Sequence, residues 1–246
     1  MEPTNAPPAA RPPWIPQAAG LVRAIRRHPG WPLVLAGSLI AGAIGVFADL
    51  AEDVHTADHI TVVDLQLANW LHAHGTPLMT RAMLAVSTLH DMVAISLLTV
   101  LLALILHRRG ERDWLLTLLL VVPGGMALNT VFKHAFARAR PHFTDPIVTL
   151  TSYSFPSGHV AGSTLFYGFL AAWLIDRTEA PGWQLAIVAA ALLMVSLVAA
   201  SRMYLGAHFA SDVVAAFFES VAWLGLGLLG RHVWHARAAA QAGSTR

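Results

Sequence analysis

The chain has 246 residues, of which 56% are hydrophobic and only 12% charged, with a mean hydropathy of +0.57. Soluble domains carry about 25% charged residues, so this composition excludes an ordinary soluble enzyme, a disordered chain and a nucleic-acid binder with a broad basic face. The formal net charge of +2 does not indicate a polyanionic partner. The chain has no cysteine, which excludes disulfides, thiolate nucleophiles and thiolate metal sites.

Continuous apolar runs dominate the sequence and predict membrane-spanning helices, because a bilayer core needs about 20 mostly apolar residues. The predicted fold class is all-α, a polytopic bundle of six transmembrane helices. Sheet is not expected, because the runs do not alternate between polar and apolar residues. A signal peptide at the first run is the alternative, but the segment before it is too long for one. The six predicted spans are 32–50, 91–107, 114–132, 159–176, 183–200 and 213–230.

Three parts are expected along the chain. Residues 1–30 are rich in Pro and Arg and are expected to form a disordered cytoplasmic tail. Residues 31–230 are expected to form the membrane domain, and residues 231–246 a short cytoplasmic tail. Residues 51–90 are too polar to cross a bilayer, and their apolar residues recur at helical spacing, which predicts two amphipathic interfacial helices. These helices either pack against the bundle or form a lid over a lateral entrance.

The distribution of basic residues predicts the orientation of the spans. Eleven of the sixteen Lys and Arg residues fall in the two tails and in 108–113 and 177–182, so this side is expected to be cytoplasmic, with both termini. The five on the other side need a local reason, since four of them cluster at the ends of spans three and five. They are Arg81, Lys133, Arg138, Arg140 and Arg202.

Three segments at the outer face bring together residues suited to phosphate chemistry. Lys133 and Arg140 are seven apart and would project from one face if the helix continued past the span. Arginine matches phosphate oxygens with a planar fork of donors, and lysine supplies a point charge. Ser157 and Gly158 precede the fourth span, where free backbone N–H groups and the helix dipole favour an anion.

The third segment supplies a histidine and a carboxylate one helical turn apart. Asp212 can accept from one ring nitrogen of His208 and leave the other free to attack as a nucleophile. His159, on a different helix, is free to donate a proton to a leaving group. A zinc site built from the same side chains is less favoured, because cations crowd the pocket.

Three ordered patterns, Lys-x6-Arg-Pro, Pro-Ser-Gly-His and Ser-Arg-x5-His-x3-Asp, closely resemble the type 2 phosphatidic acid phosphatase superfamily of lipid phosphate phosphatases. The resemblance covers roughly residues 60–230. It implies that His208 attacks phosphorus and forms a phosphohistidine, that Asp212 orients it, and that His159 is the general acid. It implies further that phosphate is held by Lys133, Arg140, Ser157, Gly158 and Arg202.

Several other residues allow two interpretations. Arg138 contacts either the substrate headgroup, which is slightly favoured, or lipid phosphates. Glu219, in the middle of the sixth span, and Asn129, in the third, are more consistent with helix packing than with a proton path or a substrate contact. Eleven of the thirteen histidines have no assigned role.

The predicted function is an integral membrane phosphatase that hydrolyses a lipid phosphate or diphosphate, of the phosphatidic acid, phosphatidylglycerol phosphate or isoprenyl diphosphate type, at the extracytoplasmic face of the cytoplasmic membrane. No cofactor is expected, because the Lys and Arg cluster can replace the Mg²⁺ that many phosphoryl-transfer enzymes use. The partners are the lipid substrate and membrane lipids, and the oligomeric state is left open. The alternatives are a phosphotransferase with the same site and, less favoured, an anion transporter. A haloperoxidase is set aside because those proteins are soluble.

Overall fold

The computed structural model describes residues 31–244, and every regular element in this part of the chain is a helix. The helices are α2 (Trp31–Thr56), α3 (His59–Ala73), α4 (Pro77–Leu89), α5 (Met92–Arg108), α6 (Arg112–Phe136), α7 (Gly158–Ile175), α8 (Pro181–Tyr204) and α9 (Ala210–Ser244). The expected tail 1–30 lies outside the described residues. The contacts divide the chain after Ser38, and the site described below lies in the unit that begins at Leu39.

Five helices are long and apolar enough to cross a membrane, and α4 with α5 forms a sixth span if this pair, bent by 45°, is counted as one. The fold class, an all-α bundle with up to six spans, is confirmed. The two helices expected within residues 51–90 are α3 and α4. They begin at local caps, with Asp58 accepting from the backbone N–H of His59 and Thr76 accepting from that of Met79.

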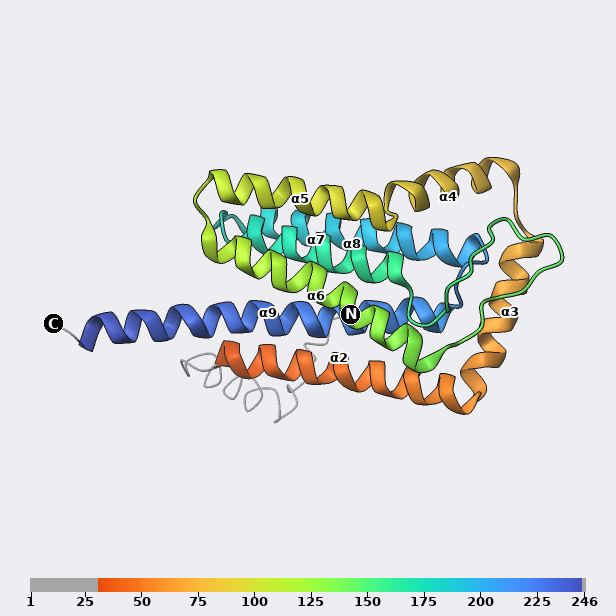
Figure 1. Ribbon diagram of the computed structural model, residues 1–246, viewed down its shortest axis with the longest axis horizontal. Coiled ribbons are helices and arrows are strands. Elements are labelled where there is room, and N and C mark those ends of the chain that lie inside the picture. The colour runs from red at the N-terminus through yellow and green to blue at the C-terminus, as the bar shows by residue number, and fades with distance from the viewer. Residues whose placement is uncertain (1–30, 245–246) are drawn as a thin grey trace, which may run out of the picture. The chain divides into compact units, whose positions relative to one another are not determined.

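Helix α7 is the centre of the bundle. It contacts α5, α6, α8 and α9, which lie alongside it in Figure 1. Leu165 and Phe169 of α7 are fully buried against Leu118 and Val121 of α6. The close approach of α6 and α7 depends on Gly125, since a Cβ there would lie 2.6 Å from the side chain of Leu165.

Helix ends position the site. Helix α6 ends at Phe136, and Ala137 adopts a left-handed conformation (φ 45°, ψ 32°), so the chain leaves the helix axis before Arg140. The expectation that a continuous helix carries both Lys133 and Arg140 is therefore wrong. Gly206 makes the tight α8–α9 turn at φ 66°, where a Cβ would lie 2.7 Å from the ring of Phe143.

At the C-terminal side, α9 continues well past the predicted end of the last span at residue 230. The helix runs without a break to Ser244, so residues 231–244 of the predicted short tail continue the last span as helix.

Candidate active site

The end of α6, the start of α7, the end of α8 and the start of α9 meet at one end of the bundle. A cavity of about 430 Å³ opens there, and its lining includes six of the residues singled out from the sequence. They are Lys133, Arg140, Gly158, His159, Arg202 and His208. Three segments far apart in the chain thus contribute to one pocket.

His208 lies in the turn before α9 and is 2% exposed. Its Nδ1 is 3.4 Å from Oδ2 of Asp212, long for a hydrogen bond but of the kind that tightens when substrate binds. Its Nε2 lies 3.1 Å from Nη1 of Arg140. A guanidinium can only donate, so Nε2 carries the lone pair and Nδ1 carries the proton that faces Asp212.

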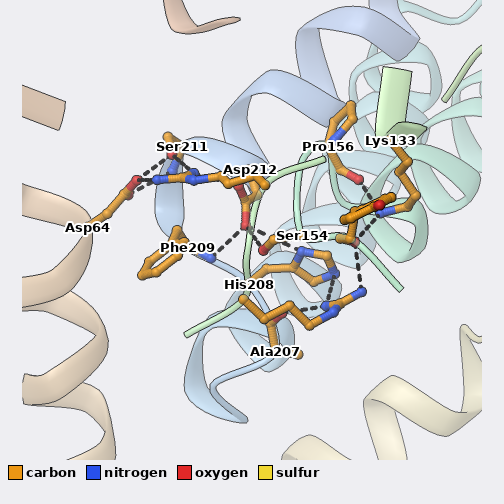
Figure 2. Close-up of polar contacts among 12 residues, drawn as sticks. Asp64, Lys133, Ser154, Pro156, Ala207, His208, Phe209, Ser211 and Asp212 are labelled. Atoms are coloured by element: carbon orange, nitrogen blue, oxygen red, sulfur yellow. Dashed lines mark hydrogen bonds and ion pairs between the residues drawn. The ribbon is translucent and has the colours of Figure 1, made fainter. Parts of the chain in front are cut away.

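Asp212 is fully buried in the first turn of α9. Its Oδ2 accepts from the backbone N–H of Phe209 at 2.9 Å and from the hydroxyl of Ser154, and its Oδ1 accepts from Arg138 at 2.6 Å (Figure 2). The bond to Phe209 closes the start of the helix in the manner of a capping box. These donors fix the orientation of the carboxylate toward His208.

The electrostatic surroundings of His208 keep its imidazole neutral. Burial lowers the pKa of His208 from 6.5 to about 4; Asp212 opposes this change, and the charges of Arg140 and Lys133 add to it. At neutral pH the ring is therefore unprotonated, which is the form that can act as a nucleophile.

Arg140 extends from the loop after α6 and is held by four protein acceptors besides His208. Its guanidinium donates to the carbonyls of Ser152, Tyr153 and Ala207 and to the hydroxyl of Ser152. Burial lowers its pKa, with Asp212 opposing, but a guanidinium remains protonated at neutral pH. These contacts place a planar, charged fork beside the Nε2 lone pair of His208.

Lys133 reaches the same loop from the last turn of α6. Its Nζ donates to the carbonyl of Tyr153 at 3.1 Å and of Pro156 at 2.6 Å (Figure 2). Arg202, at the end of α8, is 3% exposed and donates through Nη1 to Ser87 of α4. Both cations line the cavity.

Polar atoms without protein partners gather around the cavity. The Nε of Arg202 and the Oγ of Ser157 are buried and make no hydrogen bond among the described residues. Buried polar groups are normally paired, so donors of this kind are suited to an anion. Ser157 precedes α7 without capping it, and Gly158 opens that helix, where backbone N–H groups are free.

Away from this end, the cavity becomes apolar between α5 and α6. On α6 its lining extends from Lys133 to Leu119, which is about 21 Å along the helix. The walls here include Ile95, Ala103, Val122 and Met126. The polar pocket is therefore continuous with a groove lined mainly by apolar side chains.

The structure places Arg138 differently from the other predicted site residues. Its guanidinium does not line the cavity but forms ion pairs with Asp212, at 2.6 Å, and Asp64, at 2.8 Å. Both carboxylates are buried, so they hold the side chain behind the pocket. The expectation that Arg138 contacts the substrate headgroup is corrected accordingly.

Sequence reasoning missed four residues that accept hydrogen bonds from arginines at the site. Asp64 and Ser211 accept from Arg138, Ser87 accepts from Arg202, and Ser152 accepts from Arg140. Asp64 did carry a signal, because it is a carboxylate among the apolar positions of an amphipathic helix. The three serines carried none. Glu219 accepts from Asn129 at 3.0 Å, which agrees with a packing role for both.

The described residues contain no group of three or more His, Cys, Asp or Glu side chains that could hold a metal ion. The cavity lining instead contains three cationic side chains, Lys133, Arg140 and Arg202, three histidines, His90, His159 and His208, and Asp91, and the buried carboxylate of Asp212 lies behind His208. These features define a multi-pass helical membrane protein whose cavity combines cationic side chains with a buried His–Asp pair.

The model of the PAP2 superfamily matches residues 114–235 of this chain. The chain is 36% identical over 104 residues to phosphatidylglycerophosphatase B of Bacillus subtilis (strain 168), a match that covers 42% of this chain and half the length of that relative.

Two crystal structures are similar to this fold. One, with a TM-score of 0.70 and 27% identity, is the transmembrane PAP2-type phosphatidylglycerolphosphate phosphatase from B. subtilis, and the similarity covers 76% of this chain and 93% of that one. The other is LpxE from Aquifex aeolicus, with a TM-score of 0.55 and 20% identity, covering 68% of this chain and 94% of that one. The second similarity concerns the fold alone.

Proposed function

We propose that this protein is a membrane phosphatase that hydrolyses a lipid phosphate or diphosphate through a phosphohistidine intermediate. The observation that carries the proposal is the continuity of the cavity, with His208 and three cations at one end and an apolar groove at the other. A phosphate alone would not need the groove, and a hydrocarbon alone would not need the cations. A lipid with a terminal phosphate uses both.

The reaction follows from the site residues. The Nε2 lone pair of His208 attacks phosphorus, the bond from phosphorus to the lipid oxygen breaks, and His159 donates a proton to that oxygen. Lys133, Arg140 and Arg202 stabilise the charge on the equatorial oxygens. His159, now neutral, takes a proton from water, which attacks phosphorus, breaks the P–N bond and releases inorganic phosphate.

The relatives suggest which substrate to test first. The Bacillus relative and the Bacillus crystal structure are both named for phosphatidylglycerol phosphate, so this lipid is tested first, together with phosphatidic acid and an isoprenyl diphosphate. Purified protein in detergent should release phosphate from at least one of them. The His208→Ala variant should lose at least about 99% of this activity. The matched control His235→Ala, on a histidine of α9 that pairs with Asp113 of α6, should not.

The phosphohistidine has its own test. Brief incubation with ³²P-labelled lipid, followed by an alkaline quench, should trap an acid-labile phosphoprotein in the wild type and none in His208→Ala. Labelled product without a labelled protein would contradict the covalent intermediate. Transfer of label to an added alcohol would instead identify a phosphotransferase, and solute uptake by proteoliposomes without phosphate release would favour a transporter.

We further propose that the site faces the extracytoplasmic side. The opposite end of the bundle carries Arg108, Arg109, Arg112 and Arg177, as the positive-inside rule expects of a cytoplasmic face. Because the chain has no cysteine, single Asp145→Cys and Glu179→Cys variants can report topology. An impermeant maleimide added to intact cells should label the cysteine at 145, near the site, and not the one at 179. The reverse pattern would invert the orientation.

A further inference from the structure

Asp64 lies outside the three sequence motifs, yet its carboxylate reaches the back of the site from α3. It is 1% exposed and accepts from the backbone N–H of Ser211 at 3.0 Å and from the hydroxyl of the same residue. Its Oδ2 also accepts from Nη2 of Arg138 at 2.8 Å. Figure 2 shows Asp64 facing Ser211, with Asp212 on the far side of that serine.

Arg138 links Asp64 to Asp212. Its Nη1 donates to Oδ1 of Asp212 at 2.6 Å and to the hydroxyl of Ser211 at 2.7 Å. Its Nη2 donates to Oδ2 of Asp64. The guanidinium also lies 4.4 Å from the centre of the Phe209 ring. A planar fork held on both branches and packed on a ring has one orientation, so it fixes the carboxylate of Asp212 in turn.

The charges of this cluster do not cancel. One guanidinium lies between two buried carboxylates, so the cluster of Asp64, Arg138 and Asp212 carries a net charge of −1 when both acids are ionised. Buried charges are costly unless paired. Asp212 already attracts the charges of Arg140 and Lys133, and the group closest to its carboxylate that can gain a positive charge is the imidazole of His208, 3.4 Å away. That ring becomes cationic when it takes the phosphoryl group.

We propose that Asp64 and Arg138 are positioning residues that act through Asp212: they hold its carboxylate against His208 and set the net negative charge that stabilises the phosphorylated imidazole. The inference rests on the proposed function. It assigns a role to α3, which lies far from the motifs in sequence, and it replaces the substrate contact expected for Arg138.

Other charged or titratable groups face His208 from every neighbouring element. They are Lys133 of α6, Arg140 of the following loop, His159 of α7, Arg202 of α8 and Asp212 of α9. Substitutions at positions 64 and 138 leave the first four of these side chains unchanged and act on His208 through Asp212, whose contact with Arg138 they alter. Because the two variants remove charges of opposite sign, the direction of their effect on His208 separates the charge of the cluster from the loss of this contact.

The test compares three variants of the full-length protein in detergent. Asp64→Asn keeps the shape and an acceptor for Ser211 but removes a negative charge, so the pKa of His208 should fall. Arg138→Met removes the positive charge, so that pKa should rise. Both should lower kcat by about 10- to 100-fold, the range for removing hydrogen-bond partners behind metal-ligating imidazoles, with KM changed less than about threefold.

The opposite directions are the decisive readout, because loss of packing alone would not separate them. The acid limb of the kcat profile should move to lower pH in Asp64→Asn and to higher pH in Arg138→Met. Arg138→Lys should keep the acid limb of the kcat profile at its wild-type pH and recover part of kcat, since it restores the charge without the fork. If Arg138→Met does not fold, the comparison is made between Arg138→Lys and Asp64→Asn.

Histidine NMR titration gives the same comparison without turnover. The His208 resonance is identified by its loss in His208→Ala. The inference would be overturned if the acid limb, or the His208 resonance, moved in the same direction in Asp64→Asn and Arg138→Met. It would also be overturned if both stayed at their wild-type positions with wild-type kcat. A rise in KM at unchanged kcat in Arg138→Lys would instead indicate that Arg138 binds the substrate. Absence of hydrolysis by the wild type would instead refute the proposed function, while the NMR shifts would still decide the role of the cluster in setting the charge at His208.

Discussion

Replacing Arg140 by lysine tests whether the planar fork, and not only its charge, is required. The guanidinium donates to three carbonyls, one hydroxyl and Nε2 of His208. A lysine ammonium has three donors on one atom and cannot reach both Ser152 and Ala207 as the fork does. At least two hydrogen bonds of the loop are therefore lost, together with the paired donors offered to a phosphate.

The expected magnitude has two parts. The loop should lose about 3–6 kcal/mol of stability, at about 1.5–3 kcal/mol for each of two hydrogen bonds from a charged donor. Transition-state stabilisation should fall by about 3–4 kcal/mol, the cost of removing one donor from an oxyanion site, which lowers kcat by about 10²- to 10³-fold. Lys133 and Arg202 remain and should hold the residual activity above that of His208→Ala.

The assay measures initial rates of phosphate release from phosphatidylglycerol phosphate in mixed micelles, with kcat and KM determined separately and thermal unfolding followed on the same samples. Arg177→Lys is the matched control, because Arg177 also donates to a carbonyl, pairs with Glu111 and lies over Trp173, but at the opposite end of α7. It should lose comparable stability and keep turnover within about threefold. Wild-type kcat in Arg140→Lys, or an equal loss in Arg177→Lys, would refute the reasoning.

Three further predictions concern pH, tail binding and metal. Because the pKa of His208 is lowered to about 4, turnover should persist as pH falls from 7 to 5 and drop only near 4; a limb near 6.5 would contradict a buried nucleophile. The same depressed pKa makes folding stability fall as pH drops from 6.5 toward 4, so rates are taken after brief exposure. Ala103→Phe should fill the groove and slow a long-chain lipid about tenfold while sparing a water-soluble phosphate ester, and Leu104→Phe, exposed on the same helix, should affect neither; equal loss on both substrates would argue against tail binding. EDTA should leave activity unchanged, and a loss that Mg²⁺ restores would disprove the metal-independent mechanism.

Periodicity and composition were sufficient for the helices, because long apolar runs with few charges have one stable form in a bilayer. The spans beginning at residues 112, 158 and 181 start within two residues of the predicted positions. The ends of helices were harder. Helix α6 stops at a left-handed alanine, and no glycine marks that position in the sequence.

At the site, too, some residues could be predicted from the sequence and others could not. The patterns indicated the residues that face the cavity, because their chemistry is local and their spacing is short. The supporting contacts join residues far apart in sequence, as Asp64 does with Ser211 and Arg202 with Ser87. Such pairs depend on how α3 and α4 pack against α8 and α9, which no single-chain pattern encodes.

In the proposed mechanism, the hydrogen bond between Arg140 and His208 links phosphate binding to reactivity. The lone pair of Nε2 accepts from Nη1 of Arg140, so the imidazole would not attack while this bond is in place. A phosphoryl group that draws the guanidinium onto its own oxygens would also free that lone pair. Neutral lipids offer no anionic oxygens, so in their presence Arg140 would stay bonded to His208 and would keep the nucleophile inactive until a substrate phosphate binds.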